Sequence, residues 1–292
     1  MFGMVKPRIF EGLEWGIVVS GLVLGLLLVS ACQSTPLSSN LPPFKLIPFD
    51  SKPQEVRFSG HDGVSLAGQF DWPPNSSQPA LVFIIHHADP IDRNYYQYMA
   101  ARLVPAGYAV FRFDKRGTGQ SGGVYGCCEA DDALAAYRAA IAQKGFDPTR
   151  VFIVAQSIGT KILAERFDEF AQIHQPAGVV LLSNLLKFEE ILAIKTPLHI
   201  IVSDSEPELA AIGQGAARAH QTAYDYGASF YIAPQTEHSL FDISNGPIDW
   251  ADPTWPDRFH NGTWVSLINW LNTQANSPGF SGYNSNFFLI VF

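Results

Sequence analysis

The chain has 292 residues, of which 47% are hydrophobic and 16% charged, as expected for a globular domain that carries one extra apolar segment. Its formal net charge of −8 leaves no basic face for nucleic acid, and the sequence contains no arginine-rich or aromatic-basic motif, so nucleic-acid partners are excluded. We interpret the acidity as a contribution to solubility rather than as the signal of a partner.

Residues 1–31 are predicted to be a lipoprotein signal peptide. Lys6 and Arg8 precede a short apolar stretch at 17–29, and small residues follow it. The segment VSAC at 29–32 resembles the bacterial lipobox, which implies that Cys32 becomes the lipidated first residue of the mature protein. An uncleaved signal anchor is the alternative, although the apolar stretch is short for a spanning helix. In both cases we expect an exported domain held at a membrane of the bacterial cell envelope.

Residues 32–53 are rich in proline and serine and have little periodicity, so they are predicted to form a semi-extended linker. The predicted globular domain covers residues 54–277. It begins with two alternating segments, 55–59 and 64–70, whose separation by the turn residues 61–63 predicts a hairpin. The tail at 278–292 receives no assignment.

Buried strands alternate with helices from residue 80 onward. The predicted strands are 80–85, 108–113, 151–154, 178–182, 198–202 and 229–232, and the predicted helices are 95–104, 130–142, 161–165, 185–194, 208–219 and 264–271. This alternation predicts an α/β fold, with a mostly parallel sheet flanked by helices on both faces. Ligands of such sheets bind at the carboxyl ends of the strands.

The segment AQSIG at 155–159 lies between a predicted strand and a predicted helix. Small residues two positions before and after Ser157 allow a sharp turn that holds the serine hydroxyl at its tip. This is the nucleophile-elbow pattern G-x-S-x-G, with Ala155 in place of the first glycine. A serine that only caps the following helix is the alternative interpretation.

Further loops resemble those of the α/β-hydrolases, and most closely those of the bacterial esterase and serine aminopeptidase-like branch. The segment HADPIDRN at 87–94 is similar to G-S-G-P-x-D-R-[DN], and FRFDKRGTGQS at 111–121 is similar to Y-D-K-R-G-x-G-x-S. The resemblance covers roughly residues 55–273. It implies an α/β-hydrolase fold, and the lid is expected to be minimal because little more than one helix separates the strands at 178–182 and 198–202.

This resemblance implies a catalytic triad in the chain order serine, acid, histidine. Ser157 is the expected nucleophile, and His238, in the loop after the strand at 229–232, is the expected base. The segment 197–207 aligns Glu206 with the family's acid and leaves Asp204, two residues earlier, as the alternative. Glutamate can fill the role because orienting the imidazole requires a carboxylate rather than a particular chain length.

Two backbone N–H groups are the expected donors to the oxyanion. The geometry of the elbow assigns one to Ile158, and the loop after residue 85 supplies the other, with Ala88 at the matching position. His87 stands where the family usually has glycine, so this loop departs from the family pattern. The adjacent histidines at 86–87 do not predict a metal site, because neighbouring side chains point in different directions and no further ligands have zinc-like spacing. No cofactor is implied.

Several polar residues near these loops are assigned to architecture rather than to catalysis. The glycines of the segment 114–119 permit a tight turn, and Asp114 and Arg116 are expected to pair or to bond nearby backbone. Residues 92–93 are expected to brace the oxyanion loop. The cysteines at 127–128 are expected to be unpaired or strained thiols, with a disulfide as the alternative in an exported domain.

The sequence therefore predicts a membrane-tethered serine hydrolase that cleaves small or medium carboxylic esters through an acyl-enzyme. A serine aminopeptidase-like peptidase is one alternative, although no acidic cluster indicates a subsite for a substrate's amine. A surface lipoprotein that uses the same scaffold only for binding is another. Serine at the elbow argues against dehalogenase chemistry, whose nucleophile at this position is an aspartate.

Overall fold

The computed structural model describes residues 47–277. The predicted signal peptide, its lipidation site Cys32, most of the predicted linker and the tail at 278–292 lie outside these residues. Within the described part of the chain, no helix has both the length and the apolar character that a membrane span requires.

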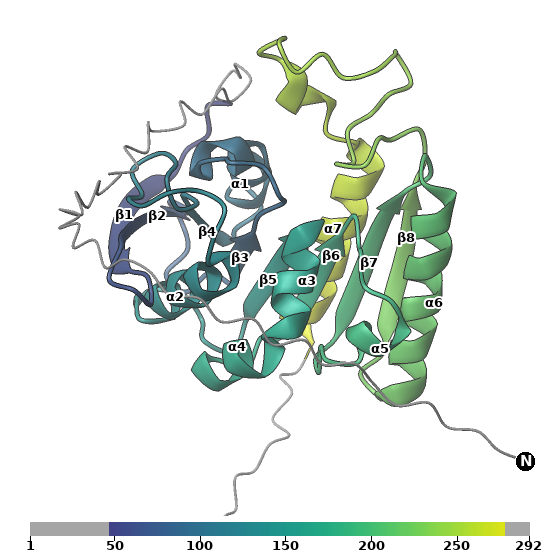
Figure 1. The fold of residues 1–292 in the computed structure, drawn as a ribbon, viewed down its shortest axis with the longest axis horizontal. Helices are drawn as coiled ribbons and strands as arrows, with labels where there is room; N and C mark the ends of the chain where they lie inside the picture. The colour runs from purple at the N-terminus through teal and green to yellow at the C-terminus, as the bar shows by residue number, and fades with distance from the viewer. Residues whose placement is uncertain (1–46, 278–292) are drawn as a thin grey trace, which may run out of the picture. The chain divides into compact units, whose positions relative to one another are not determined.

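One eight-stranded sheet organises residues 47–277, with the strand order β1-β2-β4-β3-β5-β6-β7-β8 (Figure 1). Its strands are β1 Lys52–Ser59, β2 Ser65–Trp72, β3 Leu81–Ile85, β4 Ala109–Phe113, β5 Val151–Gln156, β6 Gly178–Leu182, β7 Leu198–Ser203 and β8 Ala228–Ala233. Strand β2 runs antiparallel to β1 and β4, and the remaining neighbours are parallel. The predicted mostly parallel sheet is confirmed.

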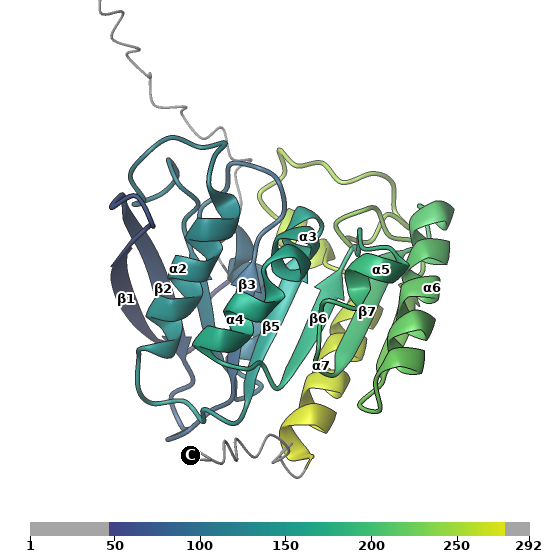
Figure 2. The same ribbon diagram turned by 60° about the horizontal axis from the view of Figure 1, so that its bottom comes forward.

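Helices cover both faces of this sheet (Figure 2). They are the 3₁₀ turn η1 Arg93–Tyr96, α1 Gln97–Leu103, α2 Glu129–Ile141, α3 Ile158–Glu165, α4 Phe167–Ile173, α5 Phe188–Ile191, α6 Pro207–Ala223, the 3₁₀ turn η2 Trp255–Arg258 and α7 Asn261–Asn276. Helices α2 to α6 contribute to one apolar core, and α1 and α7 contribute to the other. The predicted α/β class is therefore confirmed.

Strands β3 and β5 are buried along their whole length. Their alternate side chains enter opposite cores: Leu81 and Phe83 pack toward α2 and α3, whereas Val82 packs toward α1 and α7. Both faces therefore require apolar residues, which explains why these strands appear in the sequence as uninterrupted apolar runs. The same arrangement brings the ends of β3 and β5 side by side at the carboxyl edge of the sheet.

Most predicted elements shift by a few residues at their ends, and two differences bear on the start of the domain and on the segment after β6. Strand β1 begins at Lys52, before the predicted start of the domain at 54, and Ile47 already donates its backbone N–H to Gln97 Oε1 at 3.0 Å. The helix predicted over 185–194 is limited to α5, because the Asn184 side chain closes a turn on Leu186 ahead of it. The short α5 is the only helix between β6 and β7, so the predicted minimal lid is confirmed.

Candidate active site

Ser157 occupies a sharp turn between β5 and α3. Its φ of +53° and ψ of −116° are unusual for a residue other than glycine, and such conformations cost energy that the surrounding structure must supply. The serine hydroxyl makes no capping hydrogen bond to α3. Gly159 is required two residues later, because a Cβ there would lie 2.7 Å from the His86 carbonyl oxygen and 2.9 Å from that of Ile85.

The structure brings Ser157, His238 and Glu206 together at the carboxyl edge of the sheet. The Ser157 Oγ lies 2.9 Å from His238 Nε2, and His238 Nδ1 lies 2.7 Å from Glu206 Oε2. The three residues come from the β5–α3 turn, the loop after β8 and the loop between β7 and α6. The side chains of His238 and Glu206 are each 35% exposed, so solvent reaches the pair.

Asp204 lies two residues before Glu206 and makes different contacts. Its carboxylate accepts hydrogen bonds from the backbone N–H groups of Gln235 at 2.8 Å and Thr236 at 3.2 Å. These bonds fix the start of the loop that carries His238. The Ser183 hydroxyl donates to the carbonyl of His238 itself, so the loop is held on both sides of the imidazole.

Among residues 47–277, the N–H groups of the two predicted oxyanion donors have no acceptor. Ile158 is the first residue of α3, where the N–H group has no intrahelical partner and the helix dipole favours negative charge. Within residues 47–277, the His87 N–H donates to the Tyr96 hydroxyl at 3.0 Å, whereas no hydrogen bond uses the N–H of Ala88. Ala88 is exposed.

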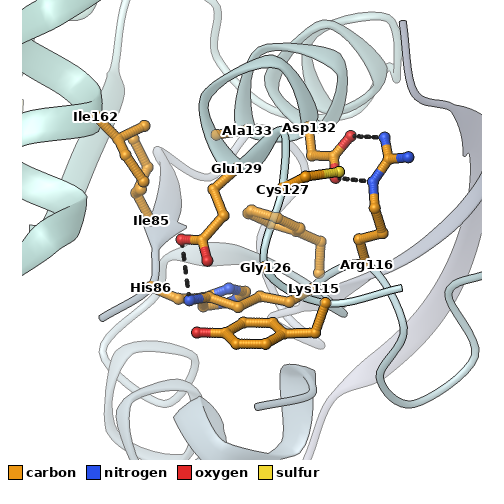
Figure 3. A pocket seen from close by; sticks show the side chains of 12 residues that line it. Ile85, His86, Lys115, Arg116, Gly126, Cys127, Glu129, Asp132, Ala133 and Ile162 are labelled. Carbon is orange, nitrogen blue, oxygen red and sulfur yellow. Dashed lines mark hydrogen bonds and ion pairs between the residues drawn. The ribbon is translucent and has the colours of Figure 1, made fainter. Parts of the chain in front are cut away.

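The histidine at position 86 is buried below this loop. Its side chain is 1% exposed, neither ring nitrogen has a hydrogen-bond partner among the described residues, and burial lowers its pKa well below the ordinary value. It borders a pocket, also lined by Lys115 and Glu129, with about 20 Å³ of space for solvent, which is room for about one water molecule (Figure 3). Among the described residues, no group of three or more His, Cys, Asp or Glu side chains could hold a metal ion.

The charged segment at 114–119 organises the turn after β4. Asp114 and Arg116 do not pair with each other: Asp114 accepts from the backbone N–H of Arg93 at 2.8 Å, and Arg116 contacts Asp62 at 2.5 Å and Asp132 at 2.6 Å. The architectural assignment of these residues therefore agrees with their contacts: Asp114 binds nearby backbone, as expected, including the N–H of Gln120 at 2.8 Å, whereas Arg116 pairs with carboxylates other than Asp114.

Lys115 and Tyr125 were missed as site residues by sequence reasoning. The Lys115 ammonium is buried against the loop after β3, and the Tyr125 hydroxyl donates to the Ala88 carbonyl. Lys115 lies inside the motif that carries the family resemblance, so the sequence marks its position. Side-chain direction is not visible in a motif, and Tyr125 lies outside it.

The cysteines at 127–128 are unpaired thiols in the structure. Their Sγ atoms are 2.6 Å apart, and Cys128 has a φ of +63° at the start of α2. Cys127 lines the pocket next to His86. Among the described residues, no hydrogen bond joins either thiol to Ser157 or His238.

Residues 77–224, just over half of the chain, match the family described as serine aminopeptidase, S33. No curated protein matches the sequence.

Several solved structures resemble the fold at low sequence identity. A Pyrococcus furiosus esterase is 16% identical with a TM-score of 0.52, covering 79% of this chain and 97% of its own. A lipase in its open form is 14% identical with a TM-score of 0.58, covering 77% and 100%. A thermophilic carboxylesterase cloned from a metagenomic library is 12% identical with a TM-score of 0.56, covering 78% and 91%. At these identities the likeness confirms the predicted α/β-hydrolase fold alone.

Proposed function

Because the chain belongs to the serine aminopeptidase family of α/β-hydrolases, we propose that it is a serine hydrolase that cleaves carboxylic esters of small or medium substrates through an acyl-enzyme. The hydrogen-bonded series Ser157–His238–Glu206 carries this proposal. A serine hydroxyl is a poor nucleophile near neutral pH. A correctly oriented imidazole activates it by accepting its proton as it attacks.

In the proposed reaction, Ser157 Oγ attacks the ester carbonyl while its proton passes to His238 Nε2. Glu206 accepts the hydrogen bond from His238 Nδ1 and stabilises the imidazolium that forms. The N–H groups of Ile158 and Ala88 donate to the oxyanion of the tetrahedral intermediate. His238 then protonates the departing alcohol, and a water molecule activated by the same imidazole hydrolyses the acyl-enzyme to release the acid and restore Ser157.

The preference for esters rests on the neighbours and on the loops around the site. Esterases and lipases are among the solved structures with this fold, which favours ester chemistry without fixing it. Only the short α5 lies between β6 and β7, so the site has no large lid of its own there. We propose small or medium substrates for a site without a large lid at this position. The proposed partner is accordingly a small-molecule ester.

An aminopeptidase-like activity is the second candidate, because the family takes its name from such enzymes. It requires a carboxylate to bind the substrate's ammonium group. Of the acidic side chains near the loop after β3, Asp89 contacts His87 and Glu129 contacts Lys115. Both carboxylates thus have partners already, which favours the esterase.

The test uses the full chain in mild detergent, with Ser157→Ala and Lys144→Met as the inactive and the surface control. We expect a fluorophosphonate probe to label Ser157 and p-nitrophenyl esters from acetate to dodecanoate to be hydrolysed, with both reactions lost in Ser157→Ala. Aminoacyl p-nitroanilides with free and blocked amino groups test the peptidase. Hydrolysis of the free-amine substrates alone would replace the esterase by the peptidase, and a folded protein without labelling or turnover would indicate a binding protein.

We also propose that the enzyme is an exported lipoprotein, tethered to a membrane of the cell envelope through acyl chains on Cys32. The support is the segment VSAC at 29–32 after a short apolar stretch, in a part of the chain outside the described residues. Each buried methylene of an acyl chain contributes about 0.8 kcal/mol to membrane binding.

A further inference from the structure

The loop at 86–92, here called the oxyanion loop, is held from the side opposite its free N–H group. The Lys115 Nζ donates to the carbonyl oxygen of His87 and, at 3.1 Å, to that of Ala88. The Tyr125 hydroxyl donates to the Ala88 carbonyl as well. Two successive carbonyl groups of the loop are therefore bound by side chains that follow β4.

Fixing the His87 carbonyl also fixes the Ala88 N–H, because both belong to one planar peptide unit. In a trans peptide these two groups point in opposite directions, and no described residue has a cis peptide bond. The Ala88 N–H is thus directed away from Lys115. A cation on the carbonyl oxygen also polarises the amide, which makes its N–H group a stronger donor.

The neighbouring N–H group does not compete for this role. The His87 N–H is used by the Tyr96 hydroxyl, which in turn donates to Gln156 Oε1 at 2.6 Å. Gln156 is the last residue of β5, immediately before Ser157. The same loop is therefore tied at His87 to the strand that carries the serine, and at the next peptide to Lys115.

We propose that Lys115 is a positioning residue of the oxyanion hole, whose ammonium group orients the His87–Ala88 peptide so that the Ala88 N–H donates to the reacting oxygen. This inference rests on the proposed function and adds to it a residue outside the triad, which acts through the backbone of the loop. Tyr125 is the second positioning residue, acting through the Ala88 carbonyl.

Lys115 is itself held in place from several elements. Its side chain is 6% exposed, and the Glu129 carboxylate at the start of α2 faces Nζ (Figure 3), at 3.3 Å. The centroid of the Tyr125 ring lies 5.4 Å from Nζ. With hydrogen bonds to two carbonyl oxygens and to the Glu129 carboxylate, this buried ammonium does not rotate freely, so it restrains the peptide that it binds.

The test compares Lys115→Met, which keeps the aliphatic stem, with Lys115→Arg, which keeps the cation, and with Lys144→Met at an exposed site. Removing one oxyanion donor typically lowers kcat by about 100- to 1000-fold. A donor that is present but misdirected should lower kcat by a smaller factor. We expect kcat for p-nitrophenyl acetate to fall about 10- to 100-fold in Lys115→Met, with KM within about threefold of the wild type. Lys115→Arg should recover most of the loss, and Lys144→Met should behave as the wild type.

The pH profile adds a readout that a purely structural role would not move. Burial lowers the pKa of Lys115, while Glu129 and Asp89 oppose this shift, and His86 and Tyr125 are the other titratable groups that face the ammonium. The wild-type kcat should therefore fall at alkaline pH as the ammonium loses its proton. In Lys115→Arg this fall should move to higher pH, because a guanidinium keeps its proton.

Tyr125→Phe keeps the test decisive if Lys115→Met does not fold, because it removes one donor to the Ala88 carbonyl without changing charge. It should lower kcat several-fold at unchanged KM. The inference is wrong if a folded Lys115→Met, or Tyr125→Phe in its place, keeps the wild-type kcat while wild type turns over esters. A wild type that neither reacts with the probe nor turns over esters refutes the proposed function first, and the role of Lys115 with it.

Discussion

At the scale of single residues, the two neighbouring carboxylates before α6 make different contacts, so their proposed roles can be separated by mutation. Glu206 contacts the imidazole of His238, whereas Asp204 binds the backbone of the loop that carries it. We expect Glu206→Gln to lower kcat by about 100- to 10,000-fold, since an amide neither fixes the tautomer nor stabilises the imidazolium. Steady-state kinetics with p-nitrophenyl acetate measure this loss.

Asp204→Asn is the matched control. Asparagine keeps one acceptor for the N–H groups of Gln235 and Thr236 and places an NH₂ group against the other, so the loop should loosen slightly. We expect a kcat within about tenfold of the wild type and a melting temperature lowered by a few degrees. A larger loss of kcat in Asp204→Asn than in Glu206→Gln would exchange the two assignments.

The sequence located these residues because each depends on position in the chain. The elbow fixes Ser157 by local pattern, and Glu206 and His238 follow from the order of loops that a known family provides. The contacts of Lys115 and Tyr125 depend on the direction of their side chains in the loop after β4. Neither apolar periodicity nor motif spacing in the sequence indicates that direction. The small residues around Ser157 predict a sharp turn, and the strained backbone of Ser157 follows from that turn.

At the scale of elements, the β5–α3 turn depends on one glycine more than on the other small residue. Ala155 lies inside β5, is fully buried and has no positive φ, so a methyl group is accommodated there. Gly159 instead faces the carbonyl oxygens at the end of β3. The departure of Ala155 from the elbow pattern therefore leaves the geometry of the turn intact.

We expect Gly159→Ala to destabilise the protein by about 1–3 kcal/mol, because the added methyl group forces α3 away from β3. The displacement also moves the N–H of Ile158, so kcat should fall along with stability. Urea unfolding followed by circular dichroism, together with ester kinetics, measures both effects. Ala155→Gly, which restores the family pattern, should keep most of the activity, and a fully active, fully stable Gly159→Ala would contradict the close approach.

The secondary structure was predictable in segments whose conformation is set by burial of apolar side chains. It was less predictable where side-chain hydrogen bonds determine where a helix begins. The largely apolar runs of β3, β5, β6 and β7 indicated buried strands, and all four are fully buried in the structure. The segment around α5 has helical spacing, yet Asn184 closes a turn on Leu186 and delays the helix. Such local side-chain bonds compete with the helix and leave no mark on apolar periodicity.

At the scale of the whole molecule, the proposed tether is tested through processing of the precursor. If Cys32 is lipidated, Cys32→Ala or treatment of cells with globomycin should block cleavage, so an unprocessed precursor accumulates and migrates more slowly than the mature protein. The mature wild type should partition into the membrane fraction. Unchanged mobility under both treatments would contradict the lipoprotein proposal and favour the signal anchor.

Acid stability of the whole domain should depend on His199, which lies in β7 and joins β8 to α7. Its ring nitrogens contact the hydroxyls of Ser229 at 2.8 Å and Ser266 at 2.9 Å, and burial lowers its pKa from 6.5 to about 4. At neutral pH the imidazole is uncharged in the folded and in the unfolded protein, so its titration does not affect the folding equilibrium. Below pH 6.5 the imidazole of the unfolded chain takes up a proton that the folded protein does not. The free energy of unfolding therefore decreases as the pH is lowered.

This linkage predicts that His199 alone removes about 2 kcal/mol of unfolding free energy between pH 7.5 and pH 5. His199→Gln keeps a hydrogen-bonding side chain but cannot take up a proton, so its loss of stability over the same interval should be smaller by about that amount. His86 and His220, whose pKa values burial also lowers, are present in both proteins and cancel in the comparison. Urea unfolding at the two pH values measures the difference. Equal decreases in the unfolding free energy of the two proteins would show that His199 takes up its proton in the folded domain as readily as in the unfolded chain.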